Sequence, residues 1–289
     1  GLLGIAVAPD GDVLYVDHTE AGSGDIVVRA FPIAAGAVDP GGASELLRMV
    51  PRCGAHLGGQ LLLDDEGNLL IGVGDGDGGR ILNPSGSSQD ETNLFGSILR
   101  VVPTVSAGEP YEIPPDNPFA GEGGEVREEI YVQGVRNPWR FALDPDTGDL
   151  WVADLGEDAF EELTLVPAAE IAGANLGWDF KEASRPFRNP DETPDDLIDP
   201  QYEYDRDDGC SIIGGVVAED PALPAVEGGF VFGDLCTGVL RVAHADGGEV
   251  EVRSLGVAVP AVVSFGQDRA GRTYVLSLTG KLLRLDPPG

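Results

Sequence analysis

One histidine stands in a context that suits acid–base chemistry. His56 lies in segment 52–60, RCGAHLGGQ, directly before an apolar run that predicts a strand. Flanking glycines allow backbone or a ligand to approach closely, and a neutral imidazole can act as a general base near pH 7. A structural loop histidine is the competing interpretation. We expect the other two histidines, His18 and His244, to be exposed in turn-like segments.

A second group of polar residues lies in segment 136–140, RNPWR. The planar guanidinium of Arg136 suits an anionic or carbonyl ligand, and Asn137 offers both a donor and an acceptor. In a chain with a net charge of −32, two arginines beside Trp and Pro are not a generic solubilising patch. The alternative is an arginine that stacks on Trp139 and pairs with an acid.

Acidic residues gather in segment 154–162, DLGEDAFEE, at the end of a predicted strand. Hard oxygen ligands suit Ca²⁺, although the spacing is not that of an EF-hand loop. A solvated acidic face is the competing interpretation. Segment 74–79, GDGDGG, is equally ambiguous. It is not a nucleotide-binding signature, because its glycine spacing differs and no Lys-Ser/Thr follows.

A repeated hairpin must position these groups. Each copy is an apolar strand, a turn with Asp or Glu and Gly, and a second strand. The copies are segments 5–16, 61–73, 141–152 and 265–276, with a weaker one at 230–242. Many short strands and Gly-rich turns favour a closed all-β architecture, and a β-propeller fits radial repetition better than a β-sandwich does. Two stretches, 74–93 and 182–200, have the composition of surface insertions.

Composition restricts the class of protein. The chain has 289 residues, of which 42 are Gly, 22 are Pro and 42% are hydrophobic, which is enough for a core. Acidic residues number 50 and basic residues 18, so nucleic acid and anionic membranes are disfavoured as partners. Its apolar runs are strand-sized and broken by Gly or Asp, so we expect no membrane span. We predict one domain over residues 1–289.

The cysteines are too few for a disulfide scaffold, and no Cys-x-x-Cys spacing occurs. Cys210 and Cys236 could form one bridge, which would leave Cys53 free. We predict this bridge because both residues lie in turn-like segments that flank one expected blade. A periplasmic or extracellular location would permit it.

The order of several motifs resembles the glucose/sorbosone dehydrogenase family. The motifs are GLLGIAVAPD, AHLGGQLLLDDEGNLLIGVGDGD, NLFGSILRV, EIYVQGVRNPWRFALDPDTGDLWVADLGEDAFEEL, NLGWDFKEA, GCSIIGG and FVFGDLCTG. The resemblance runs from residue 1 to about residue 285. It implies an all-β, six-bladed β-propeller, which could be truncated at the N-terminus because the polar residues that usually precede GLLG are absent. It also implies a soluble quinoprotein that oxidises aldose sugars, while the hedgehog-interacting propellers are non-enzymatic relatives.

The resemblance also implies site residues. Pyrroloquinoline quinone (PQQ) and calcium are the family's cofactors, a small-molecule sugar is the substrate, and an external electron acceptor reoxidises the quinone. The general base maps to His56, the quinone contacts to Arg136 and Asn137, and the residue near the sugar to Asp75. The calcium ligands map to Gly156, Glu162 and the backbone of Leu176.

This chain departs from the family pattern at three positions. Many relatives have Asn, Thr and Arg where this sequence has Leu57, Ile213 and Val239. A tricarboxylate cofactor needs cations, and the third departure removes one. The alternative function is therefore a non-catalytic secreted propeller that binds a carbohydrate or a protein partner.

Overall fold

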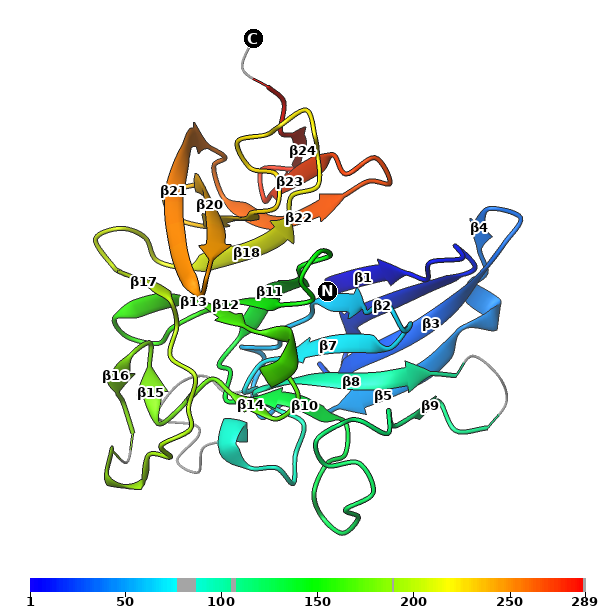
Figure 1. Ribbon diagram of the computed structural model, residues 1–289. Helices are drawn as coiled ribbons and strands as arrows, with labels where there is room; N and C mark the ends of the chain where they lie inside the picture. Colours follow the sequence, from blue (N-terminus) through cyan, green and yellow to red (C-terminus); the bar gives the residue numbers. More distant parts are fainter. Residues whose placement is uncertain (77–86, 105–107, 189, 288–289) are drawn as a thin grey trace. The chain divides into compact units, whose positions relative to one another are not determined.

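Strands make up almost all of the regular structure. The computed structural model describes residues 1–76, 87–104, 108–188 and 190–287, and within these it contains 24 strands and four short 3₁₀ turns (Figure 1). The all-β class is therefore confirmed. The chain forms two compact units, unit 1 (1–138 and 172–179) and unit 2 (139–171 and 180–289). One domain over residues 1–289 stays a prediction.

The first sheet of unit 1 is antiparallel, and its first strands follow chain order. It consists of β1 (Leu2–Val7), β2 (Val13–Thr19), β3 (Ile26–Ala34), β4 (Ala37–Val38) and β5 (Ser44–Met49), with the 3₁₀ turn η1 (Pro40–Gly42) before β5. Strand β3 pairs with β2 and also with β4 and β5. In β2 every second residue from Val13 to Asp17 is buried, because alternate side chains of a strand point to the same face.

The second sheet of unit 1 has the order β14-β10-β8-β7-β6, with β9 paired to β8. Its strands are β6 (Leu61–Leu63), β7 (Leu69–Val73), β8 (Ser97–Pro103), β9 (Tyr111–Glu112), β10 (Ile130–Gln133) and β14 (Ala174–Asn175), and η2 (Ser87–Gln89) precedes β8. Strand β14 pairs with β10 in parallel. That pairing brings the returning segment 172–179 into unit 1.

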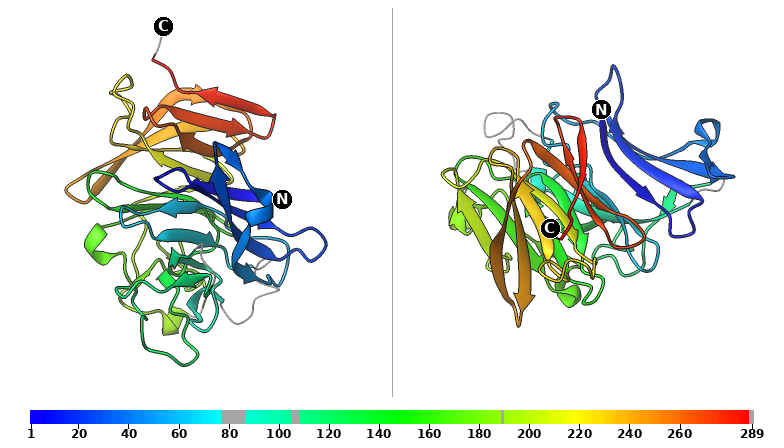
Figure 2. Two further views of the ribbon diagram at one scale, coloured as in Figure 1. Left: turned by 90° about the vertical axis from the view of Figure 1, so that its right-hand side faces the viewer. Right: turned by 90° about the horizontal axis from the view of Figure 1, so that it is seen from above.

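Unit 2 contains three larger sheets and one small hairpin. The sheets are β11 (Pro138–Leu143), β12 (Leu150–Asp154), β13 (Phe160–Val166) and β17 (Tyr202–Asp205); β18 (Ile212–Val217), β19 (Phe230–Asp234), β20 (Val239–Asp246) and β21 (Glu249–Ala258); and β22 (Val262–Gln267), β23 (Thr273–Ser277) and β24 (Lys281–Arg284). The hairpin is β15 (Lys181–Glu182) with β16 (Arg185–Pro186), and η3 (Ala168–Glu170) and η4 (Pro190–Glu192) are the 3₁₀ turns. The two C-terminal sheets, yellow to red in Figure 2, share an apolar cluster that includes Ile213, Val231 and Phe265.

All five predicted hairpins are paired strands. They are β1–β2, β6–β7, β11–β12, β19–β20 and β22–β23. In the turns of the four strong copies, Gly11, Gly67, Gly148 and Gly271 have φ between 74° and 84°. A residue with a side chain adopts this left-handed conformation at a cost, so these positions favour glycine.

The predicted number of blades is wrong for the part of the chain that the structure describes. It holds five sheets of three or more strands, and β15–β16 is the remaining two-stranded pair. Segment 182–200 is rich in Pro and Asp and lacks the alternating apolar residues that a half-buried strand needs. It therefore forms a short hairpin and a 3₁₀ turn rather than a blade. Of the other predicted insertion, 74–93, residues 77–86 lie outside the described residues.

Candidate functional site

The loop that carries His56 packs its backbone closely against the end of β7. His56 has φ +49°, and Gly58 and Gly59 also have positive φ. The Gly59 N–H donates to the carbonyl of Gly72, and the Gly76 N–H donates to the carbonyl of His56. A Cβ on Gly58 would collide with the backbone of residues 72–74. The close approach thus requires glycine at position 58. The left-handed histidine is the kind of strained position that clusters at functional sites.

The imidazole of His56 lies between a carboxylate and a guanidinium. His56 Nδ1 is 2.7 Å from Asp75 Oδ1, and Arg136 Nη2 is 2.9 Å from His56 Nε2. A guanidinium can only donate, so Nε2 must be the acceptor and must carry a lone pair. Nδ1 then carries the proton and donates it to Asp75. Hydrogen bonding thereby fixes a neutral imidazole with the lone pair on Nε2, which is the form a general base needs.

The four predicted residues of this site are drawn together in unit 1. Asp75 and Arg136 are also joined through the backbone, because the Asp75 N–H donates to the Arg136 carbonyl across 2.8 Å. Asn137 Oδ1 accepts from the Gly58 N–H at 3.0 Å, which ties it to the histidine loop. Asp75, Arg136 and Asn137 are all less than 8% exposed. The fold therefore brings together residues that lie 19 to 81 positions from His56 in the sequence.

Trp178 contacts this group, and Gln89 and Asn175 lie beside Trp178; residue types and spacing did not indicate any of the three. Trp178 Nε1 donates to Asp75 Oδ2 at 3.0 Å, and the Arg136 guanidinium lies over the Trp178 ring, 5.6 Å from its centroid. Gln89 and Asn175 pair through their side-chain amides beside Trp178. The motif NLGWDF contains two of the three residues. Nothing in its spacing links it to Asp75, because the parallel β10–β14 pairing creates the contact.

The predicted calcium site falls partly on a row of carboxylates in unit 2. Asp154, Glu162 and Glu203 are directly opposite one another on the paired strands β12, β13 and β17. Like charges opposite each other destabilise a sheet. Burial raises the pKa of Glu162 well above its usual value, and the charge of Asp154 raises it further.

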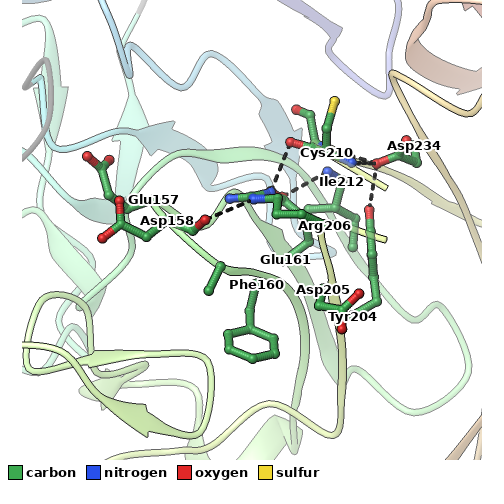
Figure 3. Close-up of polar contacts among 12 residues, drawn as sticks. Glu157, Asp158, Phe160, Glu161, Tyr204, Asp205, Arg206, Cys210, Ile212 and Asp234 are labelled. Atoms are coloured by element: carbon green, nitrogen blue, oxygen red, sulfur yellow. Dashed lines mark hydrogen bonds and ion pairs between the residues drawn. The ribbon is translucent and has the colours of Figure 1, made fainter. Parts of the chain in front are cut away.

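The neighbours of Glu162 are already supplied with donors. Glu161 accepts from the Ile212 N–H at 2.9 Å and pairs with Arg206, which also donates to the carbonyls of Asp158 and Cys210 (Figure 3). Glu182 Oε1 accepts from four consecutive backbone N–H groups, those of residues 157–160, at 2.7–3.3 Å.

For Glu162 itself, no side-chain hydrogen bond is found among the described residues. A carboxylate oxygen that accepts no hydrogen bond from the protein is a ligand type that a hard cation prefers. Gly156 lies at the start of the loop that Glu182 binds, and a Cβ there would collide with the Phe160 carbonyl. Leu176 lies in unit 1. The predicted set of Gly156, Glu162 and Leu176 stays a prediction, and the chemistry of Glu162 fits a calcium ion.

The departures from the family pattern have different environments. Ile213 is 4% exposed and belongs to the apolar cluster of the C-terminal sheets. Val239 begins β20 and is half-buried. Neither side chain can bind an anion. Among the described residues that contact His56, Arg136 is the cation.

The prediction for the cysteines is confirmed. Cys210 and Cys236 form a disulfide with a Cα–Cα distance of 5.8 Å, and Cys53 is free. The fully buried carboxylate of Asp234 accepts from the backbone N–H group of Cys210 (Figure 3) and also from that of Cys236. The prediction for the other histidines is wrong. His18 lies in β2 and His244 in β20, both half-buried, because strand alternation extends through these polar segments.

Within the described residues, no helix has the length and apolar character needed to cross a membrane.

Comparison with known proteins places the chain in a family. A family model described as glucose / sorbosone dehydrogenase matches residues 1–284. The HIPL2 protein of Arabidopsis thaliana is 31% identical over 230 residues, which is 70% of this chain and 32% of that protein. This chain therefore spans about a third of that relative's length.

Solved structures share the fold. The apo-form of the soluble aldose sugar dehydrogenase from Escherichia coli matches with a TM-score of 0.79 and 25% identity, covering 100% of this chain and 83% of that one. The PQQ-bound form of the aldose sugar dehydrogenase from Streptomyces coelicolor matches with a TM-score of 0.72 and 20% identity, covering 99% and 79%. The chain belongs to the glucose / sorbosone dehydrogenase family.

Proposed function

We propose that this protein oxidises an aldose sugar with PQQ as the hydride acceptor and His56 as the general base. The observation that carries the proposal is the position of His56 between Asp75 and Arg136, with Nε2 as the unprotonated nitrogen. A base of this kind contributes roughly 10²–10⁴ in rate. Family membership and the sugar dehydrogenases of the same fold support the reaction class.

The residues present fit the quinone end of the cofactor. Arg136 and Asn137 would hold it, because a guanidinium and an amide supply donors for a quinone oxygen and a carboxylate. When bound, PQQ would supply the acceptor for the hydride that leaves the sugar carbon, and this hydride carries both electrons of the oxidation. An external electron acceptor would then take up the electrons.

The proton path follows from the tautomer of His56. Nε2 takes the proton of the sugar hydroxyl, and Asp75 stabilises the resulting imidazolium through Nδ1. An imidazolium has no acceptor nitrogen, so Arg136 must release Nε2 when the proton arrives. Its donor is then free for the negative charge that develops nearby, and a preorganised donor in a buried site lowers the barrier.

We infer that calcium binds in unit 2 at Glu162, with Gly156 as a further ligand. The support is the row of Asp154, Glu162 and Glu203, in which Asp154 and Glu162 are buried and Glu162 has no hydrogen-bond donor among the described residues. A divalent cation would remove the repulsion between these carboxylates. We also infer a periplasmic or extracellular location, which the Cys210–Cys236 disulfide supports.

The test is reconstitution of the purified protein with PQQ and Ca²⁺, followed by a screen of aldoses for reduction of an artificial dye. We expect sugar-dependent dye reduction that is lost in Arg136→Ala. A protein that binds PQQ and shows no reduction with any aldose would contradict the proposal.

A non-catalytic binding function is the second candidate. The apolar side chains of Ile213 and Val239 favour it, because each removes a polar group that many relatives offer the cofactor. Titration of the protein with PQQ, followed by quenching of tryptophan fluorescence, separates the two functions. No quenching up to millimolar PQQ, together with retention on an immobilised oligosaccharide, is the result expected for a binding protein.

A further inference from the structure

The two carboxylate oxygens of Asp75 have different partners. Oδ1 faces His56 Nδ1 at 2.7 Å, and Oδ2 accepts the indole N–H of Trp178 at 3.0 Å. The Asp75 side chain is 4% exposed. Rotation of this carboxylate would exchange the two oxygens, and a donor fixed on Oδ2 opposes that rotation.

We propose that Trp178 is a positioning residue that holds Asp75, and through it His56, in the base-competent arrangement. An indole N–H only donates. It can fix the carboxylate without offering the imidazole proton another acceptor. A water or hydroxyl at this place could both donate and accept, and it would leave the direction of the His56–Asp75 hydrogen bond undefined.

Trp178 also contacts the other side of the site. The Arg136 guanidinium lies over the indole ring at 5.6 Å, within the range of a cation–π interaction. Arg136 in turn donates to Nε2 of His56. One indole thus restrains both charged groups that contact the imidazole, Asp75 on Nδ1 and Arg136 on Nε2, although it makes no hydrogen bond to His56 itself.

The position of Trp178 is set by a pair of side-chain amides. Gln89 Nε2 donates to the Trp178 carbonyl at 2.5 Å and to Asn175 Oδ1 at 3.0 Å. Asn175 Nδ2 returns a hydrogen bond to Gln89 Oε1 at 2.8 Å. The Trp178 N–H donates to the Gly134 carbonyl at 2.9 Å. Both backbone polar groups of Trp178 therefore make hydrogen bonds, which hold its backbone in place and so fix where the indole side chain begins.

The role in catalysis rests on the proposed function, whereas the role in ordering His56 does not. The experiment therefore begins with the protein free of cofactor. Nitrogen-15 NMR of the histidine rings is simplified by the presence of three histidines only, and His56→Asn identifies the signals of His56. We expect a protonated Nδ1, a bare Nε2 and an Nδ1–H that exchanges slowly with solvent.

Trp178→Phe keeps an aromatic ring and removes the donor. We expect exchange of the His56 Nδ1–H to accelerate about tenfold or more, because the carboxylate is no longer held against it. Trp151→Phe is the matched control. The Trp151 indole N–H is buried and makes no hydrogen bond within the described residues, so the same substitution should leave the His56 signal unchanged. A folded Trp178→Phe protein with the wild-type exchange rate would overturn the proposal.

A second variant covers the case in which Trp178→Phe does not fold. Gln89→Met keeps the approximate size of the side chain and removes the amide that binds the Trp178 carbonyl. We expect it to accelerate the same exchange by a smaller factor. An unchanged rate in Gln89→Met, when Trp178→Phe cannot be obtained, counts against the proposal.

The catalytic meaning is tested by a double-mutant cycle in the reconstituted enzyme. Trp178→Phe should lower kcat about tenfold or more with little change in KM, because misplaced catalytic groups cost turnover rather than binding. In the His56→Ala background it should have no further effect. Equal losses in both backgrounds would show a general structural role and overturn the proposal. If the wild type oxidises no sugar, the proposed function fails, and the NMR result still decides the positioning role.

Discussion

Arg136 donates a hydrogen bond to Nε2 of His56 across 2.9 Å. Because a guanidinium only donates, the contact requires a lone pair on this nitrogen. It also couples the two groups, because the proton that arrives at Nε2 displaces the arginine. Substitution of either residue should therefore affect the same chemical step.

His56→Ala should lower turnover by roughly 10²–10⁴ while leaving PQQ binding and folding intact. The measurement is the steady-state rate of the reconstituted enzyme, with cofactor binding followed by tryptophan fluorescence. His244→Ala is the control, because His244 is half-buried in β20 and contacts only the Glu227 carbonyl among the described residues. An active wild type whose His56→Ala variant keeps its turnover would contradict the assignment of the base.

Glu162→Gln should separate the effect of calcium from that of the buried carboxylates. In the wild type, added Ca²⁺ should raise Tm, because a ligand that binds only the folded state stabilises it. At a hundredfold excess over Kd, the free energy of unfolding should increase by about 2.7 kcal/mol. The variant should lose this gain. Without calcium it should melt at a higher temperature than the wild type near neutral pH, because burial raises the pKa of Glu162 and its ionisation costs stability as pH rises.

The control for this experiment is Glu45→Gln. Glu45 is an exposed residue of β5 that pairs with Arg48, and its substitution should leave the calcium-dependent gain intact. Equal melting of the wild type with calcium and with a chelator, together with no metal by elemental analysis, would exclude the site.

The disulfide predicts a definite count of thiols. Denatured, unreduced protein should show one reactive thiol, that of Cys53, and reduction should raise the count to three. A bridge that spans 26 positions contributes on the order of 3 kcal/mol by restricting the unfolded chain. Cys210→Ser with Cys236→Ser should therefore lower the free energy of unfolding by about that amount. Three thiols before reduction would show that the bridge does not form.

Asp234 should make the protein sensitive to acid. Burial alone would raise the pKa of this carboxyl, but backbone N–H donors from Thr237, Ser211 and Cys210 outweigh burial and hold the pKa below its usual value. A carboxyl with a lowered folded-state pKa stabilises the protein above its unfolded pKa near 3.8, and this stability is lost as pH falls through the folded value.

Asp234→Asn tests this directly. In the variant, the side-chain amide nitrogen would face backbone N–H groups that donate to a carboxylate oxygen in the wild type. We therefore expect the free energy of unfolding to fall by about 2–4 kcal/mol at neutral pH. The difference in free energy of unfolding between the variant and the wild type, measured by urea unfolding, should become smaller as pH falls below about 4. A difference that stays constant over this range would mean that the charge of Asp234 does not contribute.

The sequence alone determined the hairpins, because their signals are local. A turn that contains an acidic residue and a glycine between apolar strands specifies both the left-handed glycine and the two strands beside it. The weak copy at 230–242 obeys the same rule, since Gly238 has φ +70° and β19 pairs with β20. The number of blades is not set by such local signals. Segment 182–200, which was predicted as a surface insertion, forms a short hairpin and a 3₁₀ turn rather than a further sheet.

The candidate site divides in the same way. Glycines around His56 and the pair Arg136–Asn137 could be identified from residue types and from resemblance to a family. Only the tertiary structure brought Trp178 to Asp75, across 103 positions of sequence, because the parallel pairing of β14 with β10 returns a distant segment to unit 1. Likewise, Asp154, Glu162 and Glu203 became one row only when strand register placed them opposite one another. Contacts of this kind depend on pairing between distant strands, and no short-range pattern encodes them.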